Sequence, residues 1–227
     1  MTATPTVDEQ AMIRLTAHPL QRIGAYAMAH LAGGADPSTL DAAAFQAAVD
    51  RMAEHAIVAA LSRDTKAPEG FFLKSSLSFF PNSPMFHPSN AKRSDPEIRD
   101  RVLAWRRRPG AETWPGVPCV LCYAGAVGFF GKMDVPLAES DVYRDNTIRG
   151  HAGMALCWPC LCCFYALPYG SHLTGGPSLA LRSWDEAFLA RAVGIQVTRT
   201  RQVVTAGSTA REELRAREVL ALKHLRH

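Results

Sequence analysis

The sequence lacks several patterns that would place it in a familiar class of protein. It contains no run of about 18 apolar residues, so we expect no helix that spans a membrane. Residues 1–9 lack the basic and apolar regions of a secretion signal, which favours a cytoplasmic location. The apolar fraction of 48% and the charged fraction of 20% are ordinary for a globular chain of 227 residues.

Recognisable catalytic motifs are also missing. The chain has no G-x-S-x-G, no phosphate-binding P-loop, no H-E-x-x-H and no cluster of carboxylates near potential metal ligands. We therefore expect a binding or scaffold protein rather than an enzyme.

What the sequence does contain is two cysteine pairs near its middle. Cys119 and Cys122 form one C-x2-C, Cys157 and Cys160 form another, and 34 residues separate the pairs. Two such knuckles can place four thiolates around one zinc ion. Six cysteines without a secretion signal favour metal binding over disulfides. We predict one structural zinc ion per chain, bound by these four cysteines.

The cysteine pattern leaves three other interpretations open. Cys160 and Cys163 form a further C-x2-C, so Cys163 could replace Cys157 as a ligand. The run Cys-Trp-Pro-Cys resembles the C-x-P-C motif of thioredoxin-like redox proteins, although no βαβ unit is evident before it. The remaining alternative is a group of buried free thiols.

Hydrophobic periodicity and turn residues predict an α+β fold. We expect an N-terminal helical hairpin over residues 8–63, with an interruption at Pro19, and a helix that begins at Ser94 and ends in an arginine run. The aromatic run 71–80 and residues 195–204 are predicted as short strands. Further predicted elements are a strand at 126–130, a buried helical turn at 161–167, and helices at 183–193 and from Thr209. The predicted regions are 1–110, 111–172 around the zinc finger, and 173–227, in one compact unit.

Three features together resemble a known family. They are the early helix from His18 to Tyr26, the loop Phe79–Phe86 with its two prolines, and the cysteine quartet, in that order. This layout, over residues 12–205, resembles the large subunits of class 1 (Cascade-type) CRISPR effector complexes. The short length is most similar to the compact zinc-finger large subunit of type IV systems.

The resemblance implies a function without catalysis. Such a subunit sits at the foot of a crRNA-bound complex, contacts the short motif (PAM) flanking the target, and helps to unwind the duplex. The implied partners are the backbone and 5′-handle-binding subunits, the crRNA, target double-stranded DNA and a DinG-type helicase. The zinc ligands carry over onto the four cysteines. Larger relatives have a C-terminal helical bundle that this chain lacks, so functions of that bundle do not carry over.

We place the DNA-binding surface on the loop and on the arginine run. Of the 25 basic residues 20 are arginine, whose planar fork suits phosphate. Three prolines stiffen the stretch 81–90, and polar side chains there could meet groove edges or phosphates. The predicted DNA-binding residues are Lys74, Asn82, Ser83, Asn90, Lys92, Arg93, Arg106, Arg107 and Arg108. Cations also favour a helix C-terminus without any ligand, and the loop could be a simple connection.

Two functions of other classes compete with the CRISPR assignment. One is a stand-alone, zinc-stabilised adaptor that binds nucleic acid. The other is a thiol-disulfide oxidoreductase that uses the C-x-P-C motif.

Overall fold

A computed structural model describes residues 12–138, 153–173 and 178–206 of the chain. Its helices are α1 (Pro19–Leu31), α2 (Ala42–Ser62), α3 (Phe71–Ser78), α4 (Asp95–Arg106), α5 (Trp158–Gly170) and α6 (Glu186–Ala206). Short 3₁₀ turns occur at Pro37–Thr39, Pro68–Gly70, Pro88–Lys92 and Ala111–Thr113. The strands are β1 (Gly128–Phe130), β2 (Met154–Leu156), β3 (His172–Leu173) and β4 (Ser178–Leu179). The predicted α+β class with a central four-cysteine cluster is confirmed.

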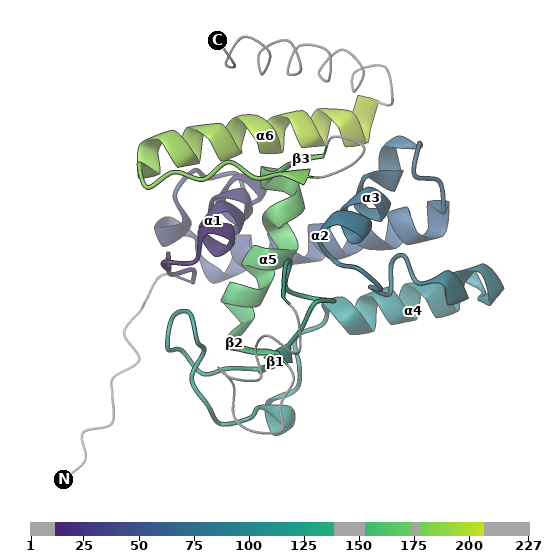
Figure 1. Cartoon of the computed structure of the whole chain (residues 1–227), viewed down its shortest axis with the longest axis horizontal. Helices are drawn as coiled ribbons and strands as arrows, with labels where there is room; N and C mark the ends of the chain where they lie inside the picture. Colours follow the sequence, from purple (N-terminus) through teal and green to yellow (C-terminus); the bar gives the residue numbers. More distant parts are fainter. Residues whose placement is uncertain (1–11, 139–152, 174–177, 207–227) are drawn as a thin grey trace.

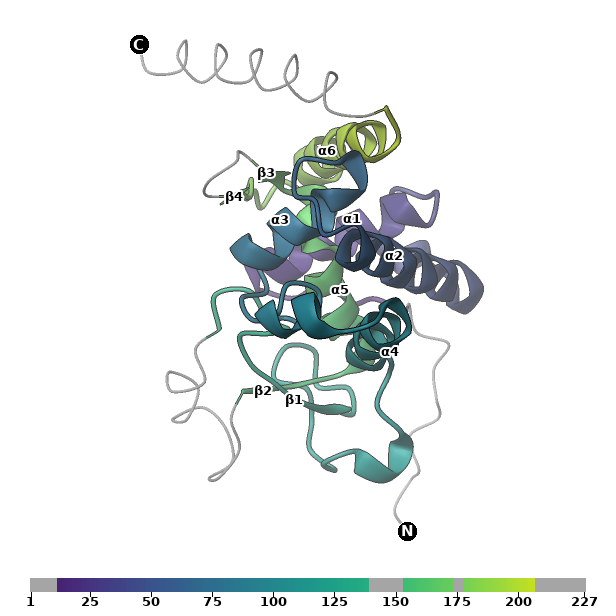
Figure 2. The ribbon, with the colours of Figure 1, turned by 90° about the vertical axis from the view of Figure 1, so that its right-hand side faces the viewer.

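Helix α5 is the centre of the molecule. Twelve of its 13 residues are buried, and its apolar residues lie on every side, as expected for a helix that is enclosed by other elements. In Figures 1 and 2, α5 runs between α6 at one end of the molecule and the ribbon of β1 and β2 at the other. The first turn of this core helix therefore lies beside the cysteine-containing region.

Helix α1 packs more extensively against α5 than against any other element. Gly24 makes this close approach possible, because a Cβ atom at that position would overlap the backbone carbonyl of Cys163. Ala25, Ala27 and Ala29 are completely buried beside it. Small residues thus bring the backbones of α1 and α5 together, whereas the predicted helical partner of α1, α2, has only a minor contact with it.

The helix boundaries follow from local chemistry. Pro19 occupies the first turn of α1, and the Nδ1 atom of His18 accepts a hydrogen bond from the backbone of Gln21 at 3.4 Å. Ser94 and Glu97 form a capping box at the start of α4, where the sequence predicted that a helix begins. The predicted helix before Pro19 does not form over residues 12–18, and residues 1–11 lie outside the described part of the chain.

Two β predictions are wrong. The aromatic run from Phe71 is helix α3, in which Phe71 and Phe72 are buried and the Ser75 hydroxyl donates to the Phe71 carbonyl at 3.1 Å. Burial of the rings, rather than intrinsic strand preference, decides the structure here. The helix satisfies its own backbone hydrogen bonds, so it can bury these rings without a neighbouring strand to pair with.

The predicted strands over 195–204 lie instead within α6, which continues well beyond the predicted end at 193. Leu189, Val193, Val197 and Thr200 recur at helical spacing and are all buried. A helix buries this stripe along one side, whereas a strand would turn alternate residues to solvent. The helix predicted from Thr209 falls outside the described residues.

The two sheets are small and antiparallel. In the first, Gly128 pairs with Leu156 and Phe130 with Met154. In the second, His172 pairs with Leu179. Within the described ranges, no helix is long and apolar enough to cross a membrane.

Candidate metal centre

The four predicted cysteines converge on one point. The sulfur atoms of Cys119, Cys122, Cys157 and Cys160 all lie within 4.8 Å of one another, and those of Cys122 and Cys157 are 3.4 Å apart. A tetrahedral zinc–thiolate site with bonds of about 2.3 Å has sulfurs about 3.8 Å apart. A disulfide would need about 2.05 Å, and all six cysteines are free. The spacing therefore suits a shared metal ion.

The first knuckle is a tight turn fixed by backbone hydrogen bonds. The Cys119 amide donates to the Ala124 carbonyl at 2.7 Å, and the Tyr123 amide donates to the Cys119 carbonyl at 3.0 Å. Tyr123 adopts a left-handed conformation, with φ of 64°, which lets the chain reverse after Cys122. The Val120 amide donates to Ala155 in β2 at 2.9 Å, so this knuckle is attached to the strand that precedes the second pair.

The second knuckle is the junction of β2 and α5. Cys157 is the N-cap residue of α5, and Cys160 lies in the first turn of that helix. The Leu161 amide donates to the Cys157 carbonyl at 3.1 Å. Pro159 occupies the first turn, where the missing amide proton costs no helical hydrogen bond. The strand and the helix thus hold the two sulfurs in place.

Burial and mutual hydrogen bonding perturb all four thiols. Hydrogen bonds from the other three cysteines, with the largest effect from Cys122, hold the pKa of Cys119 far below its usual range. Cys119 raises the pKa of Cys122, but hydrogen bonds from Cys157 and Cys160 lower it by more, to about 7. The pKa values of Cys157 and Cys160 are raised, in each case mainly by Cys119. Four thiolates so close together need a cation among them to be ionised at once.

The residues fit a metal ion on chemical grounds. Four sulfur donors with tetrahedral spacing suit soft or borderline divalent metals. Cys119, Cys157 and Cys160 are buried, and Cys122 is half-buried. A cavity of about 200 Å³, lined in part by Arg14, Cys122 and Pro159, opens on the centre.

Cys162 and Cys163 lie apart from this centre. Both are completely buried on α5, and the Gln21 side-chain amide donates to the Cys163 sulfur at 3.6 Å. Cys163 therefore does not replace Cys157 in the group of four sulfur atoms. The C-x-P-C run does lie between a strand and a helix, but that strand pairs only with antiparallel β1 in the described part of the chain.

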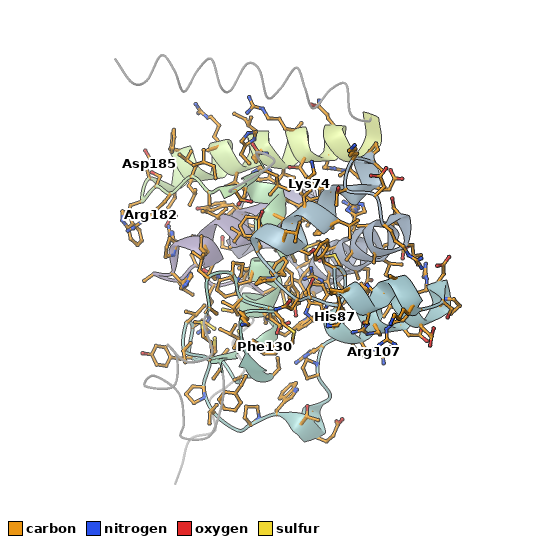
Figure 3. The ribbon with its side chains drawn as sticks, turned by 45° about the vertical axis from the view of Figure 1, so that its right-hand side comes forward. Lys74, His87, Arg107, Phe130, Arg182 and Asp185 are labelled. Atoms are coloured by element: carbon orange, nitrogen blue, oxygen red, sulfur yellow. The ribbon has the colours of Figure 1, made fainter. Side chains whose placement is uncertain are left out.

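Six of the nine predicted DNA-binding residues are on or near the surface. Asn82, Lys92, Arg107 and Arg108 are exposed, and Lys74 and Arg93 are half-buried. Figure 3 shows Lys74, on α3, well apart from His87 and Arg107. The guanidinium of Arg108 lies 4.9 Å from the ring centroid of Trp114. The exposed cations therefore do not form one continuous patch with Lys74.

Ser83 and Asn90 are corrections to the predicted site, because both side chains are interior. Ser83 is 0% exposed. The Asn90 amide donates to the Pro84 carbonyl at 2.8 Å, and its side-chain oxygen accepts from Arg101 at 3.0 Å. These bonds hold the loop in shape. Asn90 and Ser83 cannot reach a phosphate in this conformation.

Arg106 is a third correction. It is 4% exposed, and its guanidinium carbon lies 3.9 Å from the ring centroids of both Trp105 and Tyr165, and 5.3 Å from that of Phe80. None of its side-chain nitrogens has a hydrogen-bond partner within the described residues. Burial lowers the pKa of Arg106 from its ordinary value. An arginine enclosed by aromatic rings belongs to the core and not to a DNA-binding surface.

Helical periodicity contained the signal for this burial. Ile98 and Val102 are fully buried in α4, and Arg106 continues their spacing of four residues. The sequence interpretation grouped Arg106 with its two exposed neighbours because they share a charge. Arg106 is the last residue of α4 and lies on the buried side of the helix, whereas Arg107 and Arg108 follow the helix and are exposed.

Asp134 is a site residue that sequence reasoning did not find. Its carboxylate accepts a hydrogen bond from the Trp105 indole at 2.7 Å and from the Tyr165 hydroxyl at 2.9 Å. Burial raises the pKa of Asp134, although these two hydrogen bonds oppose the rise. This carboxylate connects the chain after the first knuckle to α4 and α5. A single acidic residue in a polar stretch carries no sequence pattern that would predict this.

No protein-family model, curated protein or solved structure matches this chain.

Proposed function

We propose that this chain is the non-catalytic large subunit of a crRNA-guided CRISPR effector complex, of the compact type found in type IV systems. The observation that carries the proposal is the four-sulfur centre, which joins two knuckles 34 residues apart. The resembled family has such a centre after an early helix and a proline-rich loop. In this role the guide RNA reads the target sequence, while the protein contacts the flanking duplex and helps to open it.

The metal in this proposal is zinc, with a structural role. Zinc takes four cysteine ligands in tetrahedral structural sites, whereas catalytic zinc keeps one position for water. Four converging sulfurs would fill the coordination sphere. The centre would then connect the first knuckle to the beginning of α5, and through α5 to the rest of the core.

The proposed DNA-binding surface is smaller than the sequence predicted. It comprises Asn82, Lys92 and Arg93 at the loop, with Arg107 and Arg108 after α4. The loop is well held for this purpose: Arg101 donates to both the Ser89 hydroxyl and the Asn90 side chain at 3.0 Å. A loop fixed before binding loses less conformational entropy when it meets DNA. Lysine and arginine there would neutralise phosphate charge.

The partners in this proposal are the backbone and 5′-handle-binding subunits, the crRNA, target double-stranded DNA and a DinG-type helicase. The decisive experiment is to purify the tagged chain from cells that carry its native genomic neighbourhood and to sequence the RNA that co-purifies. We expect short RNAs of one length class that share a constant 5′ segment. Cys119→Ser, processed in parallel, should recover little of this RNA because its fold is compromised.

Absence of such RNA, with the folded wild-type chain recovered, would contradict the proposal. Binding of duplex DNA by the chain alone, without RNA, would then favour the stand-alone zinc adaptor. Turnover of a dithiol–disulfide couple would favour the oxidoreductase. These three results separate the candidate functions.

A second experiment tests the DNA-binding surface in the assembled complex. Asn82→Ala and the double variant Lys92→Ala/Arg93→Ala are compared with the wild type on targets with correct and altered flanks, at several salt concentrations. Loss of a phosphate contact should reduce the log–log salt slope by about one for each contact, and loss of a base contact should relax the flank preference. Lys66→Ala, at an exposed lysine outside the surface, is the control. Variants that match the wild type in all three properties would place the DNA-binding surface elsewhere.

A further inference from the structure

Helix α6 carries positive charge along most of its length. From Ala187 to Ala206 the sequence contains Arg191, Arg199 and Arg201 and no acidic residue. The acids just before this stretch have structural roles. Asp185 accepts a hydrogen bond from the Phe188 amide at 3.0 Å, and Glu186 pairs with Arg22 at 2.7 Å. The outer part of α6 is therefore basic.

The outward side of α6 also carries apolar side chains. Phe188 is 50% exposed and Ile195 is 49% exposed, although the opposite side of the helix is buried in the core. Phe188, Arg191, Ile195 and Thr198 follow one another at intervals of three and four residues, so they lie along one side of the helix. We call these four residues the outer stripe.

The outer stripe borders a hollow of about 440 Å³ between α6 and the end of α1. The hollow is lined by His30, Arg191, Gly194, Ile195, Thr198 and Arg199. His30 is held close to the helix: its Nε2 atom lies 3.0 Å from the Ala190 carbonyl oxygen, and a Cβ at Gly194 would meet its ring at 2.6 Å. The Thr198 hydroxyl donates to the Gly194 carbonyl at 2.9 Å, which leaves Arg191 and Arg199 as the cations that border a space large enough for a phosphate group.

An exposed aromatic residue and nearby arginines also lie just before the beginning of α6. Trp184 is 59% exposed and lies four residues before Phe188. The guanidinium carbons of Arg182 and Arg22 lie 4.9 Å and 5.4 Å from its ring centroid. Figure 3 shows Arg182 and Asp185 together at this end of the helix. Two exposed aromatic residues, Trp184 and Phe188, thus lie between Arg182 and Arg191 in the sequence.

We propose that the outer stripe of α6 binds single-stranded nucleic acid. Phosphate groups occupy the hollow beside Arg191 and Arg199, and unstacked bases pack on Phe188 and Ile195. Proteins that bind single strands combine a basic groove for the backbone with aromatic platforms for the bases. A duplex offers phosphates to the same arginines but keeps its base faces stacked inside, so it leaves Phe188 and Ile195 without a partner.

This inference goes beyond the proposed duplex contact and uses a different surface. Figures 1 and 2 place α6 and α4 on opposite sides of α5, so the outer stripe is separate from the surface at Arg107 and Arg108. The single-strand site needs no guide RNA and no other subunit. It can be tested on the purified chain, independently of the CRISPR proposal.

The test measures fluorescence anisotropy of labelled oligothymidylate, oligouridylate and a duplex of equal length with the full, metal-loaded chain. Phe188→Ala should weaken single-strand binding by roughly five- to 150-fold, the loss expected for one stacked base, and leave the salt slope unchanged. Arg191→Gln should reduce the salt slope by about 0.7, the value for one phosphate contact on a single strand. Duplex binding should change less with Phe188→Ala than single-strand binding does.

Matched controls are available on two other helices. Leu77→Ala removes a similarly exposed apolar side chain from α3, and Arg99→Gln removes an exposed arginine from α4. Both should leave single-strand binding unchanged. Because Phe188 and Arg191 are exposed, their variants should fold, and a thermal denaturation curve checks this.

Three results would overturn the proposal. The first is no single-strand binding by the wild type at micromolar concentrations. The second is equal affinity of Phe188→Ala and wild type for both oligonucleotides. The third is a change in the molecular mass of the chain in solution with Phe188→Ala and no change in oligonucleotide affinity, which would identify the outer stripe as a protein-docking surface. A failure of this kind leaves the crRNA experiment unaffected, since that experiment depends on other residues.

Discussion

The sulfur atoms of Cys122 and Cys157 lie 3.4 Å apart, although 34 residues separate the two cysteines in the chain. Cys157 also caps the helix at the centre of the core. The metal centre and the hydrophobic core are therefore one structural unit.

The purified chain should contain one zinc ion. Cys119→Ser should lose it, since three thiolates and a hydroxyl bind zinc far less tightly, whereas Cys162→Ala should retain it because Cys162 lies outside the centre. Structural zinc contributes about 10–16 kcal/mol, as much as the net stability of a domain at about 5–15 kcal/mol. Chelation should therefore abolish cooperative unfolding. Elemental analysis and circular dichroism measure both effects. Full zinc occupancy in a folded Cys119→Ser chain would contradict the assignment.

Gly24→Ala should destabilise the protein severely. The added Cβ would overlap the carbonyl of Cys163, and two helix backbones must separate to admit it. Overpacking typically costs about 1–3 kcal/mol, and this variant should reach the upper end of that range because the overlap is with backbone atoms. Gly34→Ala is the matched control, since its Cβ would meet only the Ala29 carbonyl at an ordinary 3.7 Å, and it should change stability by less than about 1 kcal/mol. Urea denaturation distinguishes them. Equal stability of the two variants would show that α1 can move away from α5 at little cost.

Arg106 tests how a buried guanidinium stabilises the core. Its side chain lies against the rings of Trp105 and Tyr165 but has no hydrogen-bond acceptor among the described residues. Cation–π contacts contribute about 2 kcal/mol each when desolvated, while burial of the ion costs several kcal/mol. Arg106→Met, which keeps the volume, should therefore change the free energy of unfolding by less than about 1.5 kcal/mol. Arg106→Ala should reduce it by about 2–5 kcal/mol, because it leaves a cavity.

Denaturation of both variants by guanidinium chloride measures these differences. If Arg106→Met were as destabilising as Arg106→Ala, the prediction would be wrong, and the positive charge of Arg106 would itself stabilise the core. Neither variant should alter the proposed DNA binding, because Arg106 does not reach the surface.

His55 should make stability depend on pH. Burial, and secondarily Arg51, lowers the pKa of His55, whose Nδ1 lies 2.7 Å from the Tyr169 hydroxyl. The folded state therefore favours the neutral ring. Its contribution to stability is complete above the unfolded pKa of about 6.5 and is lost as the pH falls from there toward the lowered folded value.

The measurement is the free energy of unfolding between about pH 7.5 and pH 5 for wild type and His55→Gln. The wild type should lose stability more steeply, by up to about 1.4 kcal/mol per pH unit, because one more proton binds on unfolding. The difference in the free energy of unfolding between the two proteins at each pH removes the contribution of the cysteine ligands, because both proteins contain the same cysteines. Parallel curves for wild type and His55→Gln would refute the prediction.

Local chemistry was readable from the sequence where a few residues decide the structure. The start of α4 was predicted at Ser94, and Ser94 and Glu97 form the capping box there. The spacing of the cysteines indicated which sulfurs could share a metal, and the structure brings those four together. In each case the residues involved are near in sequence or have chemistry that few other residues share.

Tertiary contacts decided what the sequence could not. The aromatic and β-branched residues of α3 and α6 prefer strands when isolated, but helices bury them against α2 and α5. Arg106, Arg107 and Arg108 are chemically identical, but Arg106 is the last residue of α4 and is buried, whereas Arg107 and Arg108 follow the helix and are exposed. Asn90 looked like a ligand-binding residue, yet its neighbours in space use all its polar atoms for the loop itself.

The position of Cys157 and Cys160 has a consequence for the order of folding. The first turn of a helix is the costly one to form, with a nucleation constant near 10⁻³ in isolated peptides. A metal ion bound by both cysteines would fix that turn at the N-terminus of α5 before the helix has any packing partner. Extension of α5 would then proceed toward Gly170 and create the surface on which α1 assembles. Refolding should therefore be faster when the metal is present at the start than when it is added after collapse.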